Sequence, residues 1–500
     1  MTAPDQEKTY DVCLLLEGTY PYVSGGVSSW LHRLISGMPD LSFTAVCIVP
    51  SSRDELTSKY ETPPNFQGHR VMPLHDLPDV PRYSPRDLGR RQMDVIRSFH
   101  AGLKERDFAG LGDIIAAFRQ GEMPLSAVLH GRKAWNMLVE AYGPETNNES
   151  FLNFFWTFRL THLAMFRAVT FGLPRARVYH SISTGYAGLL GATARTLHGR
   201  PFLLTEHGIY VKERKIEISQ ADWIYREDSP RMRVSRGLTF FQDYWVRIFS
   251  SLARIAYQSA DRIYTLYEGN RQLEIAEGAP AHKIEIIPNG IEIERFADLP
   301  HRDPAAAAAE GFAVGFVGRV VPIKDVKTFI RAVKIVSTRV KVTAYVMGPY
   351  EEDEGYYREC RELVELLGLA GTVRFTGPVN VAEYYPRLDL VVLTSISEAQ
   401  PLVLMEANCA GVPAVATDVG SCRELLEGRT PEDRDLGPSG LVTRTADPID
   451  TARAMGEILT DPGLRARMAE AGRRRITAHY RESDLLARYH DIYAHYKEQP

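Results

Sequence analysis

Two glutamates near residue 400 have a spacing that suits the binding of hydroxyl groups. Glu398 and Glu406 lie within SISEAQPLVLMEANCAGVPAVATDVGS, residues 395–421. Pro401 suits the first turn of a helix, so we expect Glu398 in the loop before that helix and Glu406 on its second turn. The loop carboxylate can accept hydrogen bonds from sugar hydroxyls, and the helical one from the two adjacent hydroxyls of a ribose. Two solvated carboxylates at a helix end are the alternative interpretation.

Candidate phosphate-binding groups occur in two places. Arg319 and Lys324 lie in VGFVGRVVPIKDVKTFIRAV, in an expected loop before a helix that Asp325 can cap. A guanidinium fork and a lysine point charge at a helix N-terminus form a good clamp for a diphosphate. Leu402 and Val403 open the helix between the two glutamates, where free backbone N–H groups can bind phosphate. Two solvated loop cations would show the same pattern as Arg319 and Lys324.

The N-terminal part of the chain contributes backbone rather than charge. Gly25 and Gly26 separate the expected strand YDVCLLLEG from a segment with an apolar helical stripe. Paired glycines let backbone amides approach a phosphate or an acceptor without a Cβ in the way, and Glu17 lies close by at the strand end. A tight turn that requires a positive φ would explain the same glycines.

Short apolar strands alternate with helical segments in both halves of the sequence. The expected strands of the first half are 11–17, 43–50, 176–183, 201–208, 261–267 and 284–290. Those of the second half are 312–318, 340–348, 372–379, 389–395 and 412–420. Such alternation predicts α/β domains with parallel sheets covered on both faces, and ligands beyond the carboxyl ends of the strands.

The strand signal is absent between about residues 73 and 171, which predicts a helical insertion in the first domain. Residues 297–311, with two prolines and an alanine run, form the best linker. We therefore expect an N-terminal domain over 1–300 and a C-terminal domain over 301–480. A helix over 481–500 is expected to pack back on the first domain.

Composition limits the possible classes of protein. A chain of 500 residues favours two domains, and a net charge of −4 gives no electrostatic reason to expect nucleic acid. The five scattered cysteines are typical of buried thiols in a reducing compartment. No apolar run approaches the length of a membrane-spanning helix. We therefore expect a cytoplasmic protein that does not itself span a membrane.

The Glu398-x7-Glu406 pair, followed by the strand GVPAVAT, resembles the signature of retaining glycosyltransferases of family four. Members of that family have two Rossmann-like domains that face each other across a cleft, the GT-B fold. The resemblance implies that Arg319 and Lys324 hold the donor diphosphate. It also implies that His207, in TEHGIY, lies near the donor sugar. His207 and Glu398 would then orient and polarise that sugar rather than attack it.

Other segments extend this resemblance over most of the chain. IIPNGIE matches the family at the domain junction, where Asn289-Gly290 would form a hinge turn, and Glu424 matches an acidic position of the family. The order Ala399-Gln400 after the first glutamate departs from the family pattern. A helix-start carboxylate without a chemical role would explain Glu424 equally well.

The segments LLLEGTYPYVSGGVSSW, TEHGIYVKERKIEI and SISEAQPLVLMEAN together resemble the glycosyltransferases that serve the Pel exopolysaccharide system. That resemblance implies transfer of a hexose or an N-acetylhexosamine from a UDP-sugar donor to a growing saccharide acceptor. The donor is a substrate, and neither a cofactor nor a metal is expected. Inner-membrane partners for polysaccharide synthesis and export are implied as well.

Three other functions compete with this one. A nucleotide-sugar epimerase can use the same fold, and a non-catalytic scaffold could carry it without activity. A scaffold would not need all five of the candidate site residues that the sequence contains, which are Glu398, Glu406, Arg319, Lys324 and His207. An NAD-dependent oxidoreductase is disfavoured because the first strand is followed by Gly-Gly rather than by G-x-G-x-x-G.

Overall fold

The computed structural model describes residues 8–499, apart from 54–55, 77–86, 106–107, 109, 144–145, 147–148, 221–238 and 301–309. The chain divides into two compact units. The first contains residues 1–265, 271–286 and 488–500, and the second contains residues 266–270 and 287–487. The main division therefore falls at 286/287 rather than at residue 300, and most of the expected linker lies outside the described residues.

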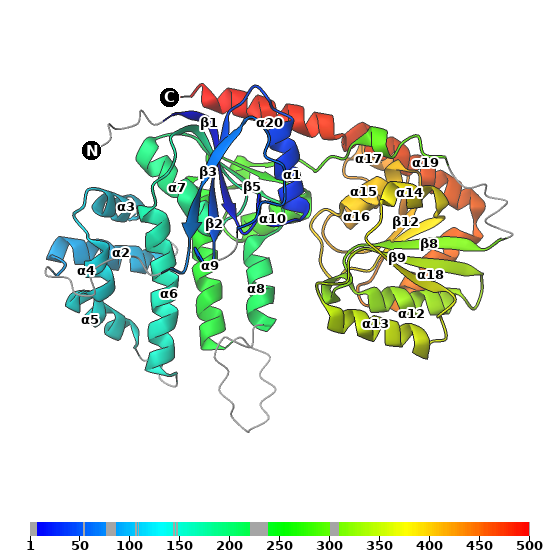
Figure 1. The fold of residues 1–500 in the computed structure, drawn as a ribbon, viewed down its shortest axis with the longest axis horizontal. Coiled ribbons are helices and arrows are strands. Elements are labelled where there is room, and N and C mark those ends of the chain that lie inside the picture. The colour runs from blue at the N-terminus through cyan, green and yellow to red at the C-terminus, as the bar shows by residue number, and fades with distance from the viewer. Residues whose placement is uncertain are drawn as a thin grey trace. The chain divides into compact units, whose positions relative to one another are not determined.

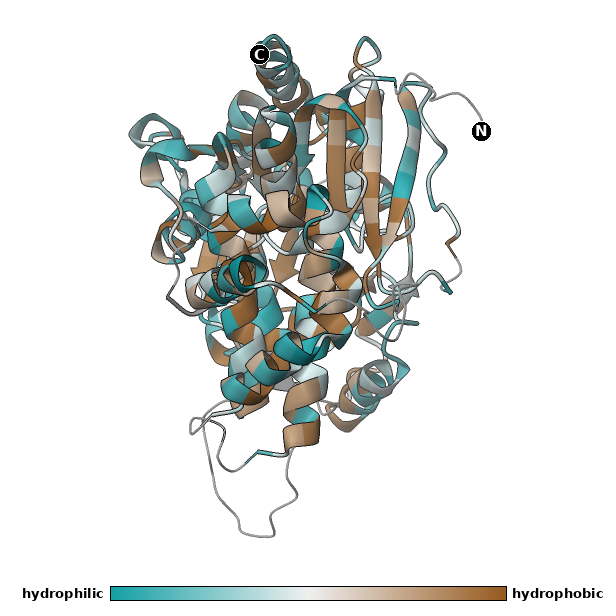
Figure 2. Cartoon of the chain, turned by 90° about the vertical axis from the view of Figure 1, so that its left-hand side faces the viewer, coloured by the Kyte–Doolittle hydropathy of each residue, from teal (hydrophilic) through white to brown (hydrophobic). Residues whose placement is uncertain are grey.

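A parallel sheet of seven strands forms the centre of the first unit, in the order β3-β2-β1-β4-β5-β6-β7. The strands are β1 (Tyr10–Glu17), β2 (Phe43–Val49), β3 (Phe66–Pro73), β4 (Ala176–Ser181), β5 (Phe202–Glu206), β6 (Arg262–Thr265) and β7 (Ile284–Ile286). In register, Leu14 of β1 pairs with Ala45 on one side and His180 on the other. The inner strands are almost wholly buried, and Figure 2 shows them as largely hydrophobic.

Helices cover this sheet, as Figure 1 shows. They include α1 (Gly26–Ser36), α7 (Tyr186–His198), α9 (Phe240–Ser259) and α10 (Glu268–Ala276). The helix α8 (Tyr210–Gln220) packs on α9 and extends beyond the sheet. The last helix, α20 (Glu482–Lys497), contributes Tyr493, whose hydroxyl lies 2.6 Å from Nδ1 of the buried His180. Its Tyr489 hydroxyl lies 3.0 Å from the Thr205 hydroxyl. The chain end is thus tied by buried polar contacts to β4 and β5.

The predicted helical insertion is confirmed. Between β3 and β4 the described chain contains α2 (Arg90–Glu105), α3 (Leu111–Arg119), α4 (Leu125–His130), α5 (Arg132–Ala141) and α6 (Phe151–Thr170). On α6, Phe154 and Phe166 are buried within the core of the first unit, whereas Trp156 is exposed.

The second unit contains a parallel sheet of six strands in the order β10-β9-β8-β11-β12-β13. Its strands are β8 (Phe312–Val317), β9 (Val342–Met347), β10 (Val373–Gly377), β11 (Leu390–Leu393), β12 (Ala414–Thr417) and β13 (Gly440–Thr443). Its longer helices are α12 (Val326–Val336), α13 (Glu354–Leu366), α15 (Leu402–Cys409), α18 (Pro448–Thr460) and α19 (Pro462–His479).

Both sheets reverse their strand order once, between β1 and β4 in the first unit and between β8 and β11 in the second. This is the order of two Rossmann-like doubly wound domains, as the sequence predicted. Loops that leave the carboxyl ends of the two strands diverge at such a reversal, which leaves space for a ligand. The two reversals are therefore the places where candidate site residues should be sought. Within the described part of the chain, no helix is long and apolar enough to cross a membrane.

Candidate functional site

Three loops of the second unit are locked together at the carboxyl edge of its sheet. They follow β8, β11 and β12. The Thr394 hydroxyl donates to the carbonyl of Asp325 at 2.9 Å, and the amide of Ile396 donates to the carbonyl of Ile323 at 2.8 Å. The Thr417 hydroxyl donates to the carbonyl of Ser395 at 2.6 Å. These bonds fix the backbone that carries the predicted donor residues.

Lys324 and Glu398, separated by more than seventy residues in sequence, form an ion pair. Lys324 ends a 3₁₀ turn (η4, Pro322–Lys324), and Asp325 caps α12 by accepting from the amide of Thr328. The Glu398 carboxylate also accepts from the Ser395 hydroxyl at 2.6 Å. Only 22% of the lysine side chain and 11% of the glutamate side chain are exposed. The ammonium is therefore held in a fixed position at the strand reversal.

Arg319 follows β8 and lies at the surface. Its guanidinium donates to both oxygens of Glu352 at 2.6 Å, and about half of each side chain is exposed. An exposed pair of this kind contributes little stability, so a phosphate can compete for the guanidinium. The backbone here is tightly packed, because a Cβ on Gly348 would lie 2.1 Å from the carbonyl oxygen of Gly318.

The helix α15 begins after Pro401, as predicted, and its N-terminus has no side-chain cap. Leu402 and Val403 are half-buried in its first turn. Glu406 lies on the second turn, where the Tyr385 hydroxyl donates to its carboxylate at 3.0 Å. This carboxylate is half-buried and oriented, which suits the acceptance of hydroxyl groups.

Gly420 is a residue of this site that the sequence motifs do not indicate. Its φ is +56°, and a Cβ there would lie 2.3 Å from the carbonyl oxygen of Ala399 and 2.5 Å from that of Glu398. The next amide, that of Ser421, donates to the Ala399 carbonyl at 2.8 Å. Gly420 thus lets the loop after β12 support the backbone of Glu398. In the sequence, the only indication of this role is the glycine at the end of VATDVG.

Two other predicted positions in the second unit have structural contacts. The Glu424 carboxylate accepts from the amide of Glu268 at 3.2 Å, and burial raises its pKa. A Cβ on Gly290 would lie 2.6 Å from the backbone of Arg481, which pairs with Ile291 in an isolated β-bridge. Gly290 therefore allows a close approach of two backbone segments. The contact of Glu424 supports the interpretation without a chemical role.

The double glycine of the first unit does not form the positive-φ turn that was one interpretation of it. Gly25 has a φ of 172°, which is extended backbone, and Gly26 begins α1 without a positive φ. A Cβ at either position would meet no atom within 4 Å. Internal packing therefore does not require these glycines. Gly18, at the end of β1, is the residue of this loop with a left-handed φ, +62°.

His207 follows β5 and packs edge-on against Trp30 of α1, with ring centroids 4.5 Å apart. Burial lowers the pKa of His207 to about 4, so its imidazole is neutral near pH 7. A neutral imidazole can orient a ligand by a hydrogen bond but carries no charge to stabilise a phosphate. The contact with Trp30 links this predicted residue to the helix that Gly26 begins.

Glu17 belongs to a buried structural network. Its carboxylate accepts from the Tyr210 hydroxyl at 2.6 Å and from the amide of Ala187, in the first turn of α7, at 3.3 Å. Burial raises its pKa. A Cβ on Gly185 would lie 2.6 Å from this carboxylate, so the glycine makes room for it. Among the described residues, no group of three or more His, Cys, Asp or Glu is arranged to hold a metal ion.

Solved structures define the class of fold. HepE of Anabaena, solved in complex with UDP, covers 97% of this chain and 99% of its own, with a TM-score of 0.58 and 15% identity. Sucrose-phosphate synthase of Thermosynechococcus elongatus covers 97% of this chain and 98% of its own, with a TM-score of 0.57 and 17% identity. The two Rossmann-like units together are the GT-B glycosyltransferase fold.

The chain belongs to the family described as "Domain of unknown function (DUF3492)", whose model matches residues 10–282. Residues 301–475 match the model "Glycosyl transferases group 1". The predicted donor residues of the second unit, from Arg319 to Glu406, lie within the second match, whereas His207, Gly25 and Gly26 lie within the first. Two family models thus divide the chain near the boundary between its two units.

Curated relatives agree with the second match. D-inositol 3-phosphate glycosyltransferase of Kribbella flavida is 31% identical over 229 residues, which are 43% of this chain and 52% of that protein. The corresponding enzyme of Acidothermus cellulolyticus is 32% identical over 223 residues, 42% of this chain and 48% of that protein. The chain spans about half the length of these relatives.

Proposed function

We propose that the protein is a retaining glycosyltransferase that moves a hexose or an N-acetylhexosamine from a UDP-sugar to a growing exopolysaccharide. The observation that carries the proposal is the ion pair of Lys324 and Glu398, fixed at the strand reversal of a unit that matches Glycosyl transferases group 1. UDP as the nucleotide is supported by the UDP complex of HepE, which shares the fold.

The chemistry assigns each residue a task. Transfer requires that the leaving diphosphate be stabilised as it gains charge, and Lys324, Arg319 and the first amides of α15 supply positive charge and N–H groups for it. Glu406 binds the ribose hydroxyls. Glu398 binds a hydroxyl of the donor sugar while it holds the Lys324 ammonium in place. Because these cations belong to the chain itself, the reaction needs no metal.

Further parts of the proposal rest on the sequence resemblance. The polymer is of the Pel type, the enzyme acts in the cytoplasm, and its partners are inner-membrane proteins of synthesis and export. His207 and the amides at Gly25 and Gly26 are the groups that we assign to the sugar and the acceptor in the first unit.

Thermal unfolding in the presence of candidate donors tests this function. A ligand that binds only the native state must raise its stability, by about 2.7 kcal/mol at a hundredfold excess over Kd. We expect a rise in melting temperature with a UDP-sugar and none with GDP-sugars, ADP-sugars or NAD. A rise with NAD and none with any UDP-sugar would exclude the proposal.

Activity provides the second test. Glu406→Ala should abolish transfer without a loss of secondary structure, and dialysis against EDTA should leave transfer unchanged. Conversion of the donor to another nucleotide sugar in the absence of acceptor would instead indicate an epimerase. Unchanged transfer by Glu406→Ala would place the site elsewhere.

A further inference from the structure

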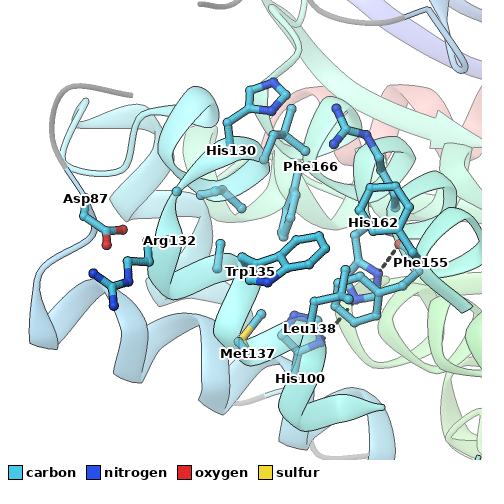
Figure 3. A pocket seen from close by; sticks show the side chains of 16 residues that line it. Asp87, His100, His130, Arg132, Trp135, Met137, Leu138, Phe155, His162 and Phe166 are labelled. Carbon is cyan, nitrogen blue, oxygen red and sulfur yellow. Dashed lines mark hydrogen bonds between the residues drawn. The ribbon is translucent and has the colours of Figure 1, made fainter. Parts of the chain in front are cut away.

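A cavity of about 720 Å³ lies within the helical insertion, among α2, α4, α5 and α6 (Figure 3). Its size is within the range of small-molecule sites. None of the residues assigned to sugar transfer lines it. Its walls are mainly aromatic and apolar, and the aromatic members are Trp135, Phe155, Phe158 and Phe166. The indole of Trp135 is 48% exposed, which is unusual for so large an apolar side chain.

Two arginines, Arg132 and Arg159, line the cavity. Arg132 is exposed on α5, and Arg159 is half-buried on α6 with its guanidinium 5.9 Å from the centre of the Phe155 ring. Among the described residues, neither forms an ion pair, and burial lowers the pKa of Arg159. Asp87 also lines the cavity, but its carboxylate accepts from the amides of Leu88 and Lys133. Figure 3 shows Arg132 beside Asp87, so Arg159 is the guanidinium of this cavity that suits a phosphate or a carboxylate.

A pair of neutral histidines, His100 and His162, lies in the wall of the cavity. His162 Nδ1 lies 2.7 Å from the carbonyl oxygen of Phe158, which can only accept, so this nitrogen carries the hydrogen. His162 Nε2 must then accept from Nδ1 of His100, 3.1 Å away. Burial lowers the pKa of His100 to about 4 and holds that of His162 well below its ordinary value, so both rings are neutral near pH 7.

This chain of bonds leaves a lone pair on Nε2 of His100. That nitrogen is buried and has no hydrogen-bond partner among the described residues. Because this nitrogen has almost no accessible surface, the histidine pair supports the wall of the cavity and does not present an acceptor to a ligand. The cavity therefore combines the Arg159 guanidinium with several aromatic rings.

We propose that this cavity is a second ligand site, which binds a small organic anion of the nucleotide class. The phosphate lies on Arg159, and the base stacks on Trp135. A neutral saccharide fits less well, since its many hydroxyls would find few acceptors in these walls. An anionic amphiphile shares the same anion chemistry, so the experiment includes one.

Titration calorimetry of the full chain with AMP, GMP and dodecyl phosphate tests the site. We expect a nucleotide to bind, and Arg159→Met and Trp135→Leu each to weaken it by about tenfold or more. Arg97→Met is the matched control, because Arg97 lies on α2 outside the cavity and pairs with Glu140. This control should leave the affinity unchanged.

The outcomes separate this site from the donor site. Glu406→Gln should retain nucleotide binding in the cavity, and loss of that binding would assign it to the donor site instead. Binding that survives both cavity variants, or no nucleotide binding at all, overturns the proposal. If dodecyl phosphate binds and neither nucleotide does, the ligand of the cavity is an anionic amphiphile and the nucleotide proposal is wrong. Since Trp135 is half exposed, its variant should fold even where Arg159→Met does not.

Discussion

Replacing either partner of the Lys324–Glu398 pair should have different effects on nucleotide binding and on sugar transfer. Lys324→Met removes the ammonium and leaves the Glu398 carboxylate, 11% exposed, with the Ser395 hydroxyl as its remaining side-chain partner. Glu398→Gln keeps the ammonium and removes the charge that competes with a diphosphate for it. The two variants therefore separate the phosphate-binding role from the sugar-binding role.

The magnitudes follow from the partial burial of the pair. An uncompensated carboxylate at this depth should cost about 1–3 kcal/mol of unfolding free energy. This corresponds to a fall in melting temperature of roughly 2–12 °C for a domain of this size. Loss of a preorganised donor to the leaving group should lower kcat/KM by about 10²–10³-fold. Glu398→Gln should reduce transfer similarly but leave the affinity for UDP equal or higher.

Calorimetry with UDP and a transfer assay with the UDP-sugar selected by thermal unfolding measure both effects. Lys327→Met is the matched control, because Lys327 lies on the first turn of α12 and pairs with Glu359. It should change neither UDP affinity nor transfer. If Lys324→Met retained kcat/KM within threefold of the wild type, the assignment of this lysine to the diphosphate would be refuted.

Three further predictions concern single residues. Gly26→Ala should leave the melting temperature unchanged or higher, because the new Cβ meets no atom within 4 Å. The same variant should lower the rate of transfer. If the kinetics of transfer were unaltered, Gly26 would not belong to the site. Gly420→Ala should destabilise the second unit by about 1–3 kcal/mol in a denaturant titration, because φ is positive and the Cβ would contact the Ala399 carbonyl. Burial and the neighbouring Glu206 raise the pKa of Glu274, so the wild type loses stability as the pH rises above the ordinary carboxylate range. Glu274→Gln should therefore have a higher melting temperature than the wild type at pH 8 but not at pH 5. An equal difference in melting temperature between variant and wild type at the two pH values would refute this prediction.

Most of the fold could be predicted because the central strands are continuous apolar runs. β1, β2, β8 and β11 are buried on both faces, and such strands have no polar alternation to obscure them. β3 was missed, because as an edge strand it carries the exposed, polar sequence QGHR. β13 was also missed, because it too lies at the edge of its sheet and has only four residues.

The sequence predicted which residues form the site in the second unit, but not which of them contact one another. Spacing placed Glu398 before α15 and Glu406 on its second turn, as the structure has them. The pairing of Lys324 with Glu398 depends on β8 and β11 being neighbours in the sheet, which no local pattern specifies. The role of Gly420 depends on a tertiary approach of two loops, so its glycine signal could not be interpreted from sequence.

The two units position their candidate residues by different physical means. In the second unit, side-chain hydroxyls of Thr394 and Thr417 bond neighbouring loop carbonyls, so the charges of Lys324 and Glu398 are held by the backbone before any ligand binds. A group that needs no reorganisation on binding stabilises developing charge most effectively. In the first unit the predicted histidine, His207, is neutral and buried, and can contribute shape and a hydrogen bond but no charge. Among the candidate residues named above, the cations, Arg319 and Lys324, lie in the second unit, so substitution of His207 should alter selectivity for the sugar more than the affinity for UDP.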